Sequence, residues 1–338
     1  MYRLVQRRGI IGLFCLLFVA SSVVPGWAQK DNRFEVSKNL DIFNSLLKEV
    51  EMFYVDSVDV DKTVQRGIEA MLAGLDPYTE YYPEQKTEEL SLMTTGEYGG
   101  IGSLIRQRNN EGGVMIAEPT EGMPADLAGL KPGDLILAID TIDVSKATNS
   151  RVSELLKGVP NTKMVLTIQR PGEKKPRKFE ITRKQITTPQ VTYYGVKNDS
   201  IGYIYLKAFT IKSAQEVKEA FLDLKKNHNI KSLVLDLRGN GGGVLEGAVQ
   251  IVGMFVPKGS EVLSTKGKIK QWDRTYRTST EPLDTVMPLA ILINGGTASA
   301  AEIVSGSLQD MDRAVLVGQR SFGKGLGQAP RDPPYNGK

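Results

Sequence analysis

The sequence predicts an α/β core in the C-terminal half of the chain, preceded by a segment of short strands and, before that, by a helical region. From about Val191 onward, apolar runs typical of buried strands alternate with amphipathic helical patterns. Between Tyr98 and about Ile186, short apolar runs are separated by turns rich in Gly and Pro. From about Phe34 to Met93, apolar residues recur at three- and four-residue spacing, which is typical of helices.

The first 28 residues have the layout of a secretory signal peptide. Arg3, Arg7 and Arg8 precede a long apolar run, and small residues follow it, with cleavage expected after Ala28. The apolar run is short for a membrane span, which needs about 20 residues. We therefore expect secretion, most simply into a bacterial periplasm. An uncleaved leader that anchors the chain in the membrane is the alternative.

Composition excludes several classes of function. The formal net charge is +4, but it falls to +1 without the leader, which argues against binding nucleic acid through bulk charge. The single cysteine, Cys15, lies in the leader, so the mature chain offers neither a thiol nucleophile nor a Cys-ligated metal site. The single histidine, His228, stands among polar residues typical of a surface turn at a helix end. A His-rich zinc site is excluded, and a Ser-His-Asp triad would need His228 itself.

The helical region contains two clear helix patterns, "FNSLLKEVEMFY" and "VQRGIEAMLAGL". The stretch "LDPYTEYY" ends the second helix, because Pro77 biases the residue before it away from helical geometry. This region could serve dimerisation or act as a lid, and the pattern does not choose between the two.

The middle segment predicts strands at "GGIGSLI", "GVMIAE", "DLILAID", "KMVLTIQR" and "KFEIT", with one helix at "NSRVSELLKG". The last segment predicts strands at "IGYIYL", "SLVLDL", "PLAILI" and "AVLVG". The helices between them are expected at "SAQEVKEAFLDLKKN", "GVLEGAVQIVGMFV" and "SAAEIVSGSLQDM".

The stretch "GQRSFGKG" near the C-terminus admits three interpretations of Lys324. A phosphate-binding loop is disfavoured, because Gly325 stands where that loop needs a hydroxyl. An S-x-x-K pair from Ser321 to Lys324 is disfavoured, because the following glycines make a helix improbable. The third interpretation is a desolvated lysine that acts as general base for a serine elsewhere.

Ser299 is the candidate partner of that lysine. "NGGTASAAEI" is a Gly-Gly turn after a buried strand, with Ser299 opening a helix whose free N–H groups could hold an oxyanion. An ordinary N-cap serine is an equally good explanation on these residues alone. "LDLRGNGGG" is a second turn of this type, where glycines either let backbone N–H groups approach a ligand or only make a flexible connection.

A resemblance decides between these alternatives. "LVLDLRGNGGG", "NGGTASAAEIVSGSLQD" and "VGQRSFGKGLGQ", together with "IGYIYLKAFT" and "YGGIG", resemble the C-terminal processing (tail-specific) serine peptidases. The resemblance covers nearly the whole mature chain in order. It implies a crotonase-like ββα catalytic core of α/β class with an inserted PDZ domain of α+β class.

The resemblance also implies roles for individual residues. Ser299 would be the nucleophile, Lys324 its base, and Gln328 the residue that assists the lysine. The oxyanion hole would be formed by backbone amides of Ala300 and of Gly242, with the neighbouring Gly241 or Gly243 as alternatives to Gly242. Two positions depart from the family's usual pattern, Ala301 for a second serine and Gly327 for valine, and neither removes a catalytic atom. No metal or other cofactor is implied.

"YGGIGSLI" resembles the carboxylate-binding loop of a PDZ domain, and "EGMPADLAGLKPGDLILAID" fits the rest of such a domain. Backbone amides of Gly99, Gly100, Ile101 and Gly102 could grip a peptide's C-terminal carboxylate while a strand edge pairs with the peptide. Ile101 is expected to line an apolar pocket. The alternative is an ordinary Gly-rich hairpin.

We therefore predict a secreted serine endopeptidase that cuts proteins near unstructured, apolar C-termini, with a homo-oligomer as an open option. A non-catalytic PDZ adaptor is the alternative, and a chymotrypsin-like PDZ protease is disfavoured because it lacks a suitably placed histidine. Relatives normally continue past residue 338, so we expect the core to be truncated. The expected parts are a signal peptide at 1–28, a helical region at 29–95, a PDZ domain at 96–186 and the core at 187–338.

Overall fold

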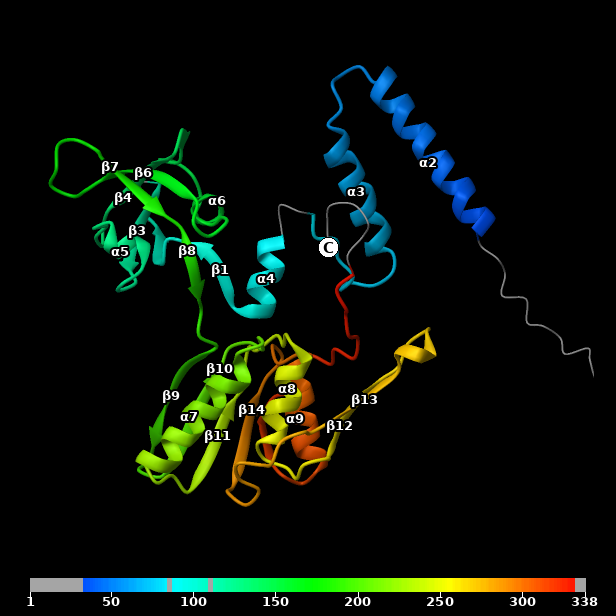
Figure 1. Ribbon diagram of the computed structural model, residues 1–338, viewed down its shortest axis with the longest axis vertical. Helices are drawn as coiled ribbons and strands as arrows, with labels where there is room; N and C mark the ends of the chain where they lie inside the picture. Colours follow the sequence, from blue (N-terminus) through cyan, green and yellow to red (C-terminus); the bar gives the residue numbers. More distant parts are fainter. Residues whose placement is uncertain (1–32, 84–86, 109–111, 332–338) are drawn as a thin grey trace, which may run out of the picture. The chain divides into compact units, whose positions relative to one another are not determined.

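The computed structural model describes residues 33–83, 87–108 and 112–331, and the chain divides into two units between Asp76 and Pro77 (Figure 1). The expected signal peptide at 1–28 lies outside the described residues. In the described part of the chain, no helix is both long enough and apolar enough to cross a membrane.

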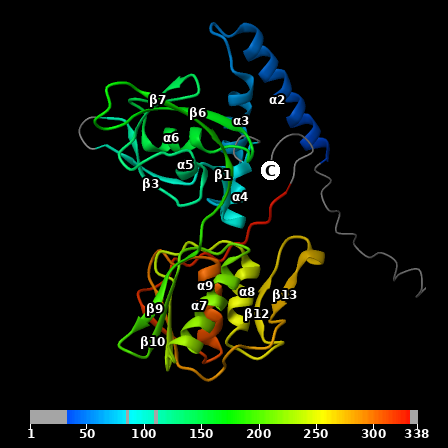
Figure 2. The same cartoon turned by 60° about the vertical axis from the view of Figure 1, so that its left-hand side comes forward.

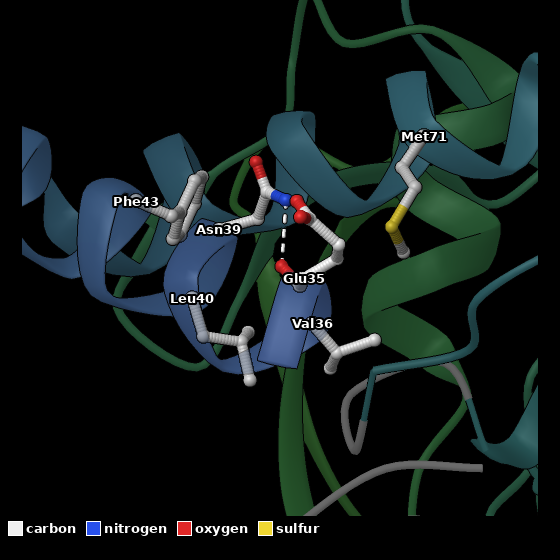
Figure 3. A pocket seen from close by; sticks show the side chains of 6 residues that line it. All are labelled: Glu35, Val36, Asn39, Leu40, Phe43 and Met71. Carbon is white, nitrogen blue, oxygen red and sulfur yellow. Dashed lines mark hydrogen bonds between the residues drawn. The ribbon is translucent and has the colours of Figure 1, made fainter. Parts of the chain in front are cut away.

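The first unit consists of the helices α2 (Arg33–Phe53) and α3 (Val60–Ala73), which confirms the helical N-terminal region. Asp59 caps α3 by accepting a hydrogen bond from the backbone N–H of Lys62 at 3.1 Å. Neither helix has a buried residue. Figure 3 shows the groove between them, where the side chains of both helices line an open, mainly apolar surface: Glu35, Val36, Asn39, Leu40, Phe43 and Met71.

The second unit begins with a loop and helix α4 (Thr87–Thr95), followed by an α+β domain. Its antiparallel sheet has the strand order β2-β3-β4-β6-β7, with β5 paired to β4, and β1 and β8 form a separate pair. Fully buried apolar residues such as Ile116, Ile136 and Leu166 form its core. The elements of this domain are β1 (Glu97–Gly100), β2 (Ser103–Gln107), β3 (Val114–Pro119), α5 (Pro124–Leu127), β4 (Leu135–Ile139), β5 (Ile142–Asp143), α6 (Asn149–Leu156), β6 (Lys163–Gln169), β7 (Arg177–Thr182) and β8 (Lys184–Thr187).

The rest of the second unit is an α/β core with the strand order β15-β14-β11-β10-β9. Strands β10, β11, β14 and β15 run parallel, and β9 is antiparallel at one edge. Its elements are β9 (Val191–Lys197), β10 (Ile201–Leu206), α7 (Ser213–Asn227), β11 (Ser232–Asp236), α8 (Leu245–Gly253), β12 (Glu261–Thr265), η2 (Lys270–Trp272), β13 (Arg274–Arg277), β14 (Leu289–Ile293), α9 (Ala300–Asp310) and β15 (Val315–Gly318).

The strand order explains where the helices of the core lie. Each parallel strand is followed in space by the next parallel strand of the chain, so right-handed crossovers put α7, α8 and α9 on the same face of the sheet (Figure 2). Buried aromatic rings pack between these helices, with Phe221 and Phe255 edge to face at 5.5 Å between ring centroids. The α/β fold class predicted from the sequence is confirmed.

Most of the expected elements are present, but five strands were not predicted. These are the short strands β5 and β8, the strand β9, which contains a glycine and several polar residues, and the hairpin strands β12 and β13, which carry charged residues. His228 caps the C-terminal end of α7, as the polar turn suggested, and faces Asp223 at 3.8 Å. The domain boundaries at residues 95, 186 and 187 stay predictions.

Candidate active site

The parallel strands bring three segments of the candidate site to one edge of the sheet. β11, β14 and β15 are adjacent and parallel, so the segments that follow them all leave the sheet at the same edge. The glycine-rich turn of residues 237–244 follows β11. The turn that carries Ser299 follows β14, and the segment that carries Lys324 follows β15.

Ser299 has an unusual backbone conformation. It occupies the N-cap position of α9 with φ 55° and ψ −117°, whereas an N-cap residue normally has extended backbone. A non-glycine residue in such a sparsely populated region costs about 1–3 kcal/mol and is concentrated at functional sites. The cap explanation alone does not account for this strain, whereas a nucleophile on a sharp turn does.

Gly242 lies directly against the serine. Its φ is +96°, and a Cβ placed on it would come within 2.7 Å of the Ser299 Cβ and 2.9 Å of the Ala300 backbone nitrogen. Only glycine fits there, because the backbone of one turn is packed onto the other. The backbone of Gly242 is therefore next to both the serine and the amide of Ala300. The Gly242 N–H itself donates to the Asn240 side chain at 2.9 Å, and the choice of donor among Gly241, Gly242 and Gly243 stays a prediction.

Asn240 was not singled out from the sequence, although it holds this arrangement together. The residue is fully buried, and its Nδ2 donates to the backbone oxygen of Leu206 at the end of β10, at 2.9 Å. Its backbone oxygen accepts a hydrogen bond from Ala298, just before the serine, also at 2.9 Å. Asn240 thus joins the end of β10, the glycine turn and the serine turn.

Glu302 connects the serine to the lysine segment. Its carboxylate accepts hydrogen bonds from the backbone N–H groups of Ser299 (2.8 Å), Gly323 (2.6 Å) and Lys324 (2.9 Å), and from the Ser321 hydroxyl (2.7 Å). Partial burial raises the pKa of this carboxyl, but the hydrogen bonds outweigh that effect and leave the pKa below its usual value. The ionised carboxylate therefore fixes both segments in place. The Ser299-x-x-Glu302 spacing of a capping box could have identified it from the sequence.

Lys324 is held by two groups. Its Nζ donates to Oε1 of Gln328 at 3.0 Å and lies 4.5 Å from the centre of the Tyr78 ring. The lysine is half-buried, and Phe322 is 57% exposed. The amine is thus packed less closely than the sequence suggested, because the glycines around it supply no side chains. Among the described residues, no hydrogen bond joins the Ser299 side chain to Lys324.

An ion pair between a buried aspartate and a half-exposed arginine lies at the start of the glycine turn. Asp236 is almost fully buried at the end of β11 and is bound by the Arg238 guanidinium at 2.6 Å and by the Tyr203 hydroxyl at 2.5 Å. Burial raises the pKa of Asp236, but the hydrogen bonds from Arg238 and Tyr203 outweigh it and lower the pKa. This network holds the last residue of β11 in place, and the turn that leads to Gly242 follows directly after it.

The predicted carboxylate loop lies in the α+β domain. Gly99 and Gly100 belong to β1, and Ile101 and Gly102 lead into β2. The Ile101 side chain is buried in the core of that domain. A Cβ on Gly99 would overlap the backbone oxygen of Gly158, and one on Gly102 would overlap the Met123 side chain. Close packing within the domain is therefore one reason for these glycines.

The same domain has an open strand edge. β2 is the first strand of its sheet, and in the described sheet it pairs only with β3. Helix α6 contacts the same strand. An open strand edge beside a helix is the arrangement that can accept an extended peptide as an added strand.

Within the described residues, no group of three or more His, Cys, Asp or Glu side chains is arranged to hold a metal ion. The chemistry that the residues present can support is nucleophilic. It combines a strained serine at a helix N-terminus, backbone amides beside it, and an amine on a loop tied to the same helix.

The comparison with known proteins defines the class. Residues 200–337 match peptidase family S41, and residues 115–170 match the PDZ domain. A carboxy-terminal-processing protease of Bartonella bacilliformis is 35% identical over 92% of this chain and 70% of its own length. A probable CtpA-like serine protease of Staphylococcus aureus is 33% identical over 87% of this chain, which spans only 58% of that relative.

Among solved structures, the photosystem II D1 C-terminal processing protease is 30% identical, with a TM-score of 0.44. That match covers 85% of this chain and 77% of the other. The family match and the Bartonella relative define the class, a serine-type peptidase with a PDZ domain. The chain belongs to peptidase family S41, the family of the carboxy-terminal-processing proteases.

Proposed function

We propose that this chain is a secreted serine endopeptidase that cleaves proteins near their C-termini with Ser299 as nucleophile and Lys324 as general base. The observation that carries the proposal is the strained Ser299, packed against Gly242 and tied through Glu302 to the lysine segment. A serine that only capped a helix would need neither the strain nor the link to Lys324.

In the proposed reaction, Oγ of Ser299 attacks the substrate carbonyl carbon while neutral Lys324 accepts the hydroxyl proton. The carbonyl oxygen becomes an oxyanion that accepts hydrogen bonds from the Ala300 amide and from an amide of the glycine turn at Gly241, Gly242 or Gly243. The C–N bond then breaks, and the leaving amine takes the proton from Lys324. Water hydrolyses the acyl-enzyme by the reverse proton path and frees the serine. Gln328 orients the lysine through its side-chain oxygen.

We propose that the PDZ domain selects the substrate. A C-terminal peptide would add as a strand to the open edge of β2, with its carboxylate at the loop of Gly99, Gly100, Ile101 and Gly102. An unstructured end with apolar residues suits this mode, because an extended peptide must be free to pair with the strand.

Cleavage of an unstructured protein with an apolar C-terminus tests the function. The full chain and its Ser299→Ala variant are each incubated with the substrate, and the products are read by intact mass spectrometry. We expect serine-dependent loss of C-terminal pieces. A folded chain that binds the substrate tail without cutting it would instead support a non-catalytic PDZ adaptor.

The assignment of Lys324 as general base predicts that peptidase activity depends on pH. Because Lys324 can accept a proton only when neutral, kcat/KM is expected to rise with pH. A flat profile from mildly acidic to alkaline pH, under conditions where chemistry limits the rate, would contradict the assignment of Lys324.

The location is proposed from the leader alone. Removal of residues 1–28 would release the chain into a bacterial periplasm, and N-terminal sequencing of protein from fractionated cells is expected to begin at Gln29. A membrane fraction that carries Met1 would support the anchored alternative.

A further inference from the structure

The serine turn, residues 294–299 after β14, contains a threonine to which the proposed reaction gives no role. Thr297 has no exposed surface. Its Oγ1 donates a hydrogen bond to the backbone oxygen of Leu237, at 2.8 Å, and accepts one from the backbone N–H of Asn294, at 3.0 Å. Leu237 directly follows β11 and Asn294 directly follows β14, so the hydroxyl joins the ends of two neighbouring strands.

The backbone of Thr297 is bonded to the third segment of the site. Its carbonyl oxygen accepts a hydrogen bond from the N–H of Phe322, two residues before Lys324, at 2.9 Å. Thr297 is therefore bonded to the glycine turn, to the first residue of its own turn and to the lysine segment. Glu302 joins the serine and lysine segments, and Asn240 joins the glycine turn to the serine turn, so each of these two links fewer parts of the site.

Asn294 connects the same two turns at a second point. Its Oδ1 accepts hydrogen bonds from the N–H of Gly239, at 2.9 Å, and from the N–H of Gly296, at 3.0 Å. A Cβ placed on Gly296 would come within 3.1 Å of the Gly239 Cα, so the two turns lie backbone against backbone here. The side chains of Asn294 and Thr297 thus set how the two turns are aligned.

The alignment of the two turns decides the geometry of the proposed oxyanion hole. One amide comes from the glycine turn and the other from Ala300, and both must point at the same developing charge. A misplacement of about 1 Å can slow an enzymatic reaction by about 10²-fold. The hydrogen bonds that fix one turn against the other therefore bear on the rate as well as on stability.

Loss of the hydroxyl would disturb this alignment in a defined way. The N–H of Asn294 would lose its acceptor, and the oxygen of Leu237 would keep one of its two donors, the N–H of Asn240 at 3.1 Å. A buried N–H without an acceptor is costly, so the turns are expected to shift relative to each other to regain one.

We propose that Thr297 is a positioning residue of the active site. Its hydroxyl, together with the side chain of Asn294, aligns the glycine turn with the serine turn and so sets the reactivity of Ser299 without touching the substrate. The proposal rests on the proposed role of Ser299 as nucleophile. A threonine that only stabilised the fold would change how many molecules are folded, and it would not change the reactivity of each folded molecule.

The rate at which a fluorophosphonate labels Ser299 separates these two roles. In each time course the final extent of labelling gives the fraction of competent molecules, and the rate constant gives the reactivity of each one. Thr297→Val keeps the shape of the side chain and removes the hydroxyl, and we expect its rate constant to fall by about tenfold or more. Thr297→Ser keeps the hydroxyl and is expected to stay within about threefold of the unmodified chain. An unchanged rate constant in Thr297→Val, or an equal loss in Thr297→Ser, would overturn the proposal.

Thr278 supplies a matched control in the same domain. Its Oγ1 donates to the backbone oxygen of Pro257 at 2.9 Å and accepts from the backbone N–H of Ser260 at 3.1 Å, and the residue is also buried. Thr278→Val therefore removes the same kind of hydroxyl with the same two kinds of partner, away from the serine turn. We expect it to lower stability and to leave the labelling rate constant of Ser299 unchanged. A loss equal to that of Thr297→Val would show a general effect of destabilisation, and the proposal would fail.

Asn294→Ala keeps the proposal testable if Thr297→Val does not fold. It removes the acceptor of the Gly239 N–H, and we expect the labelling rate constant and kcat for peptide cleavage to fall by about fivefold or more while KM changes little. An unchanged rate constant, or a change confined to KM, would overturn the proposal.

The same experiment distinguishes failure of this inference from failure of the proposed function. Labelling of Ser299 at the same rate in the full chain and in Thr297→Val would refute the positioning role and leave the nucleophile in place. Absence of labelling at Ser299 in the folded full chain would refute the proposed function and this inference with it.

Discussion

Two glycine-rich turns, one in the core at residues 237–244 and one in the PDZ domain at residues 99–102, look alike in the sequence. They differ in the groups that pack against their glycines. In the core, the space that a side chain on Gly242 would need is taken by Ser299 and the amide of Ala300. In the PDZ domain, the equivalent space at Gly99 is taken by the backbone of Gly158, within the domain itself. The first turn is packed onto the proposed nucleophile, and the second onto the backbone of its own domain. Glycine runs therefore indicate close backbone approach, and only the neighbour decides whether that approach serves chemistry.

The difference between the two turns is tested most strongly by adding one methyl group to the core turn. Gly242→Ala is expected to lower kcat by about 10²–10³-fold, because the methyl group displaces the serine and the oxyanion donors. Gly241→Ala is the matched control, since a Cβ there meets nothing within 4 Å, and it should change kcat by about twofold at most. Equal effects of the two substitutions in a peptide cleavage assay would contradict the packing argument.

The next largest effect is expected at Glu302. Glu302→Gln keeps the shape but replaces an acceptor by a donor opposite N–H groups, which weakens the link between the serine and the lysine segment. We expect kcat to fall by about tenfold or more while KM changes little, because the residue positions the catalytic groups and does not bind substrate.

Asp310→Asn, on the exposed end of the same helix, serves as control for Glu302. A change confined to KM in Glu302→Gln, or an equal loss of kcat in Asp310→Asn, would show that Glu302 does not act by positioning Ser299 and Lys324.

Substitutions in the PDZ turn are expected to change the affinity for peptide and to leave the reactivity of Ser299 unchanged. In Gly99→Ala the new methyl group overlaps the backbone of Gly158, whereas in Gly100→Ala its nearest neighbours are atoms of the Tyr98 side chain, which is easier to displace than backbone. Strain of this kind should weaken binding of a C-terminal peptide by about tenfold in Gly99→Ala, measured by fluorescence anisotropy. Reaction of Ser299 with a small active-site probe should stay unchanged, and loss of that reaction would argue against separate roles for the two turns.

The smallest effect is expected for a substitution of Asp284, which lies in neither turn and changes the stability of the fold. Burial raises the pKa of Asp284, but Lys225 and the backbone N–H groups of Met287 and Val286 outweigh it and lower the pKa to about 2 from 3.8. A depressed carboxyl pKa stabilises the fold above pH 3.8, and this contribution is lost as the pH falls toward 2. Asp284→Asn is expected to lower Tm by about 3 °C at pH 7 and by much less near pH 2, with kcat unchanged. An equal loss of Tm at both pH values would contradict the ionic origin.

The sequence predicted the elements that have strong local periodicity. The helix at "SAQEVKEAFLDLKKN" and the strand at "IGYIYL" match α7 and β10 residue for residue. β8 has only four residues, and its partner β1 lies about 90 positions earlier, so no local pattern marks it. Strands β12 and β13 pair only with each other and carry charged residues, so they lack the apolar pattern of a buried strand.

The sequence predicts those residues of the candidate site that stand in recognisable motifs. Ser299, Lys324, Gln328 and Gly242 stand in short stretches that resemble those of a known family. Tyr78 and Asn240 do not, because their importance comes from contacts with residues far away in the chain. Their own neighbours in the sequence indicate only a turn.

The most direct test of the account is to identify the reactive residue chemically. The full chain and its Lys324→Ala variant are treated with a fluorophosphonate probe and mapped by peptide mass spectrometry. We predict a single adduct on the peptide that carries Ser299, formed by the unmodified chain and lost or strongly reduced without the lysine. An adduct on a different serine, or equal labelling of Ser299 in a folded Lys324→Ala variant, would contradict the claim that Ser299 and Lys324 act together.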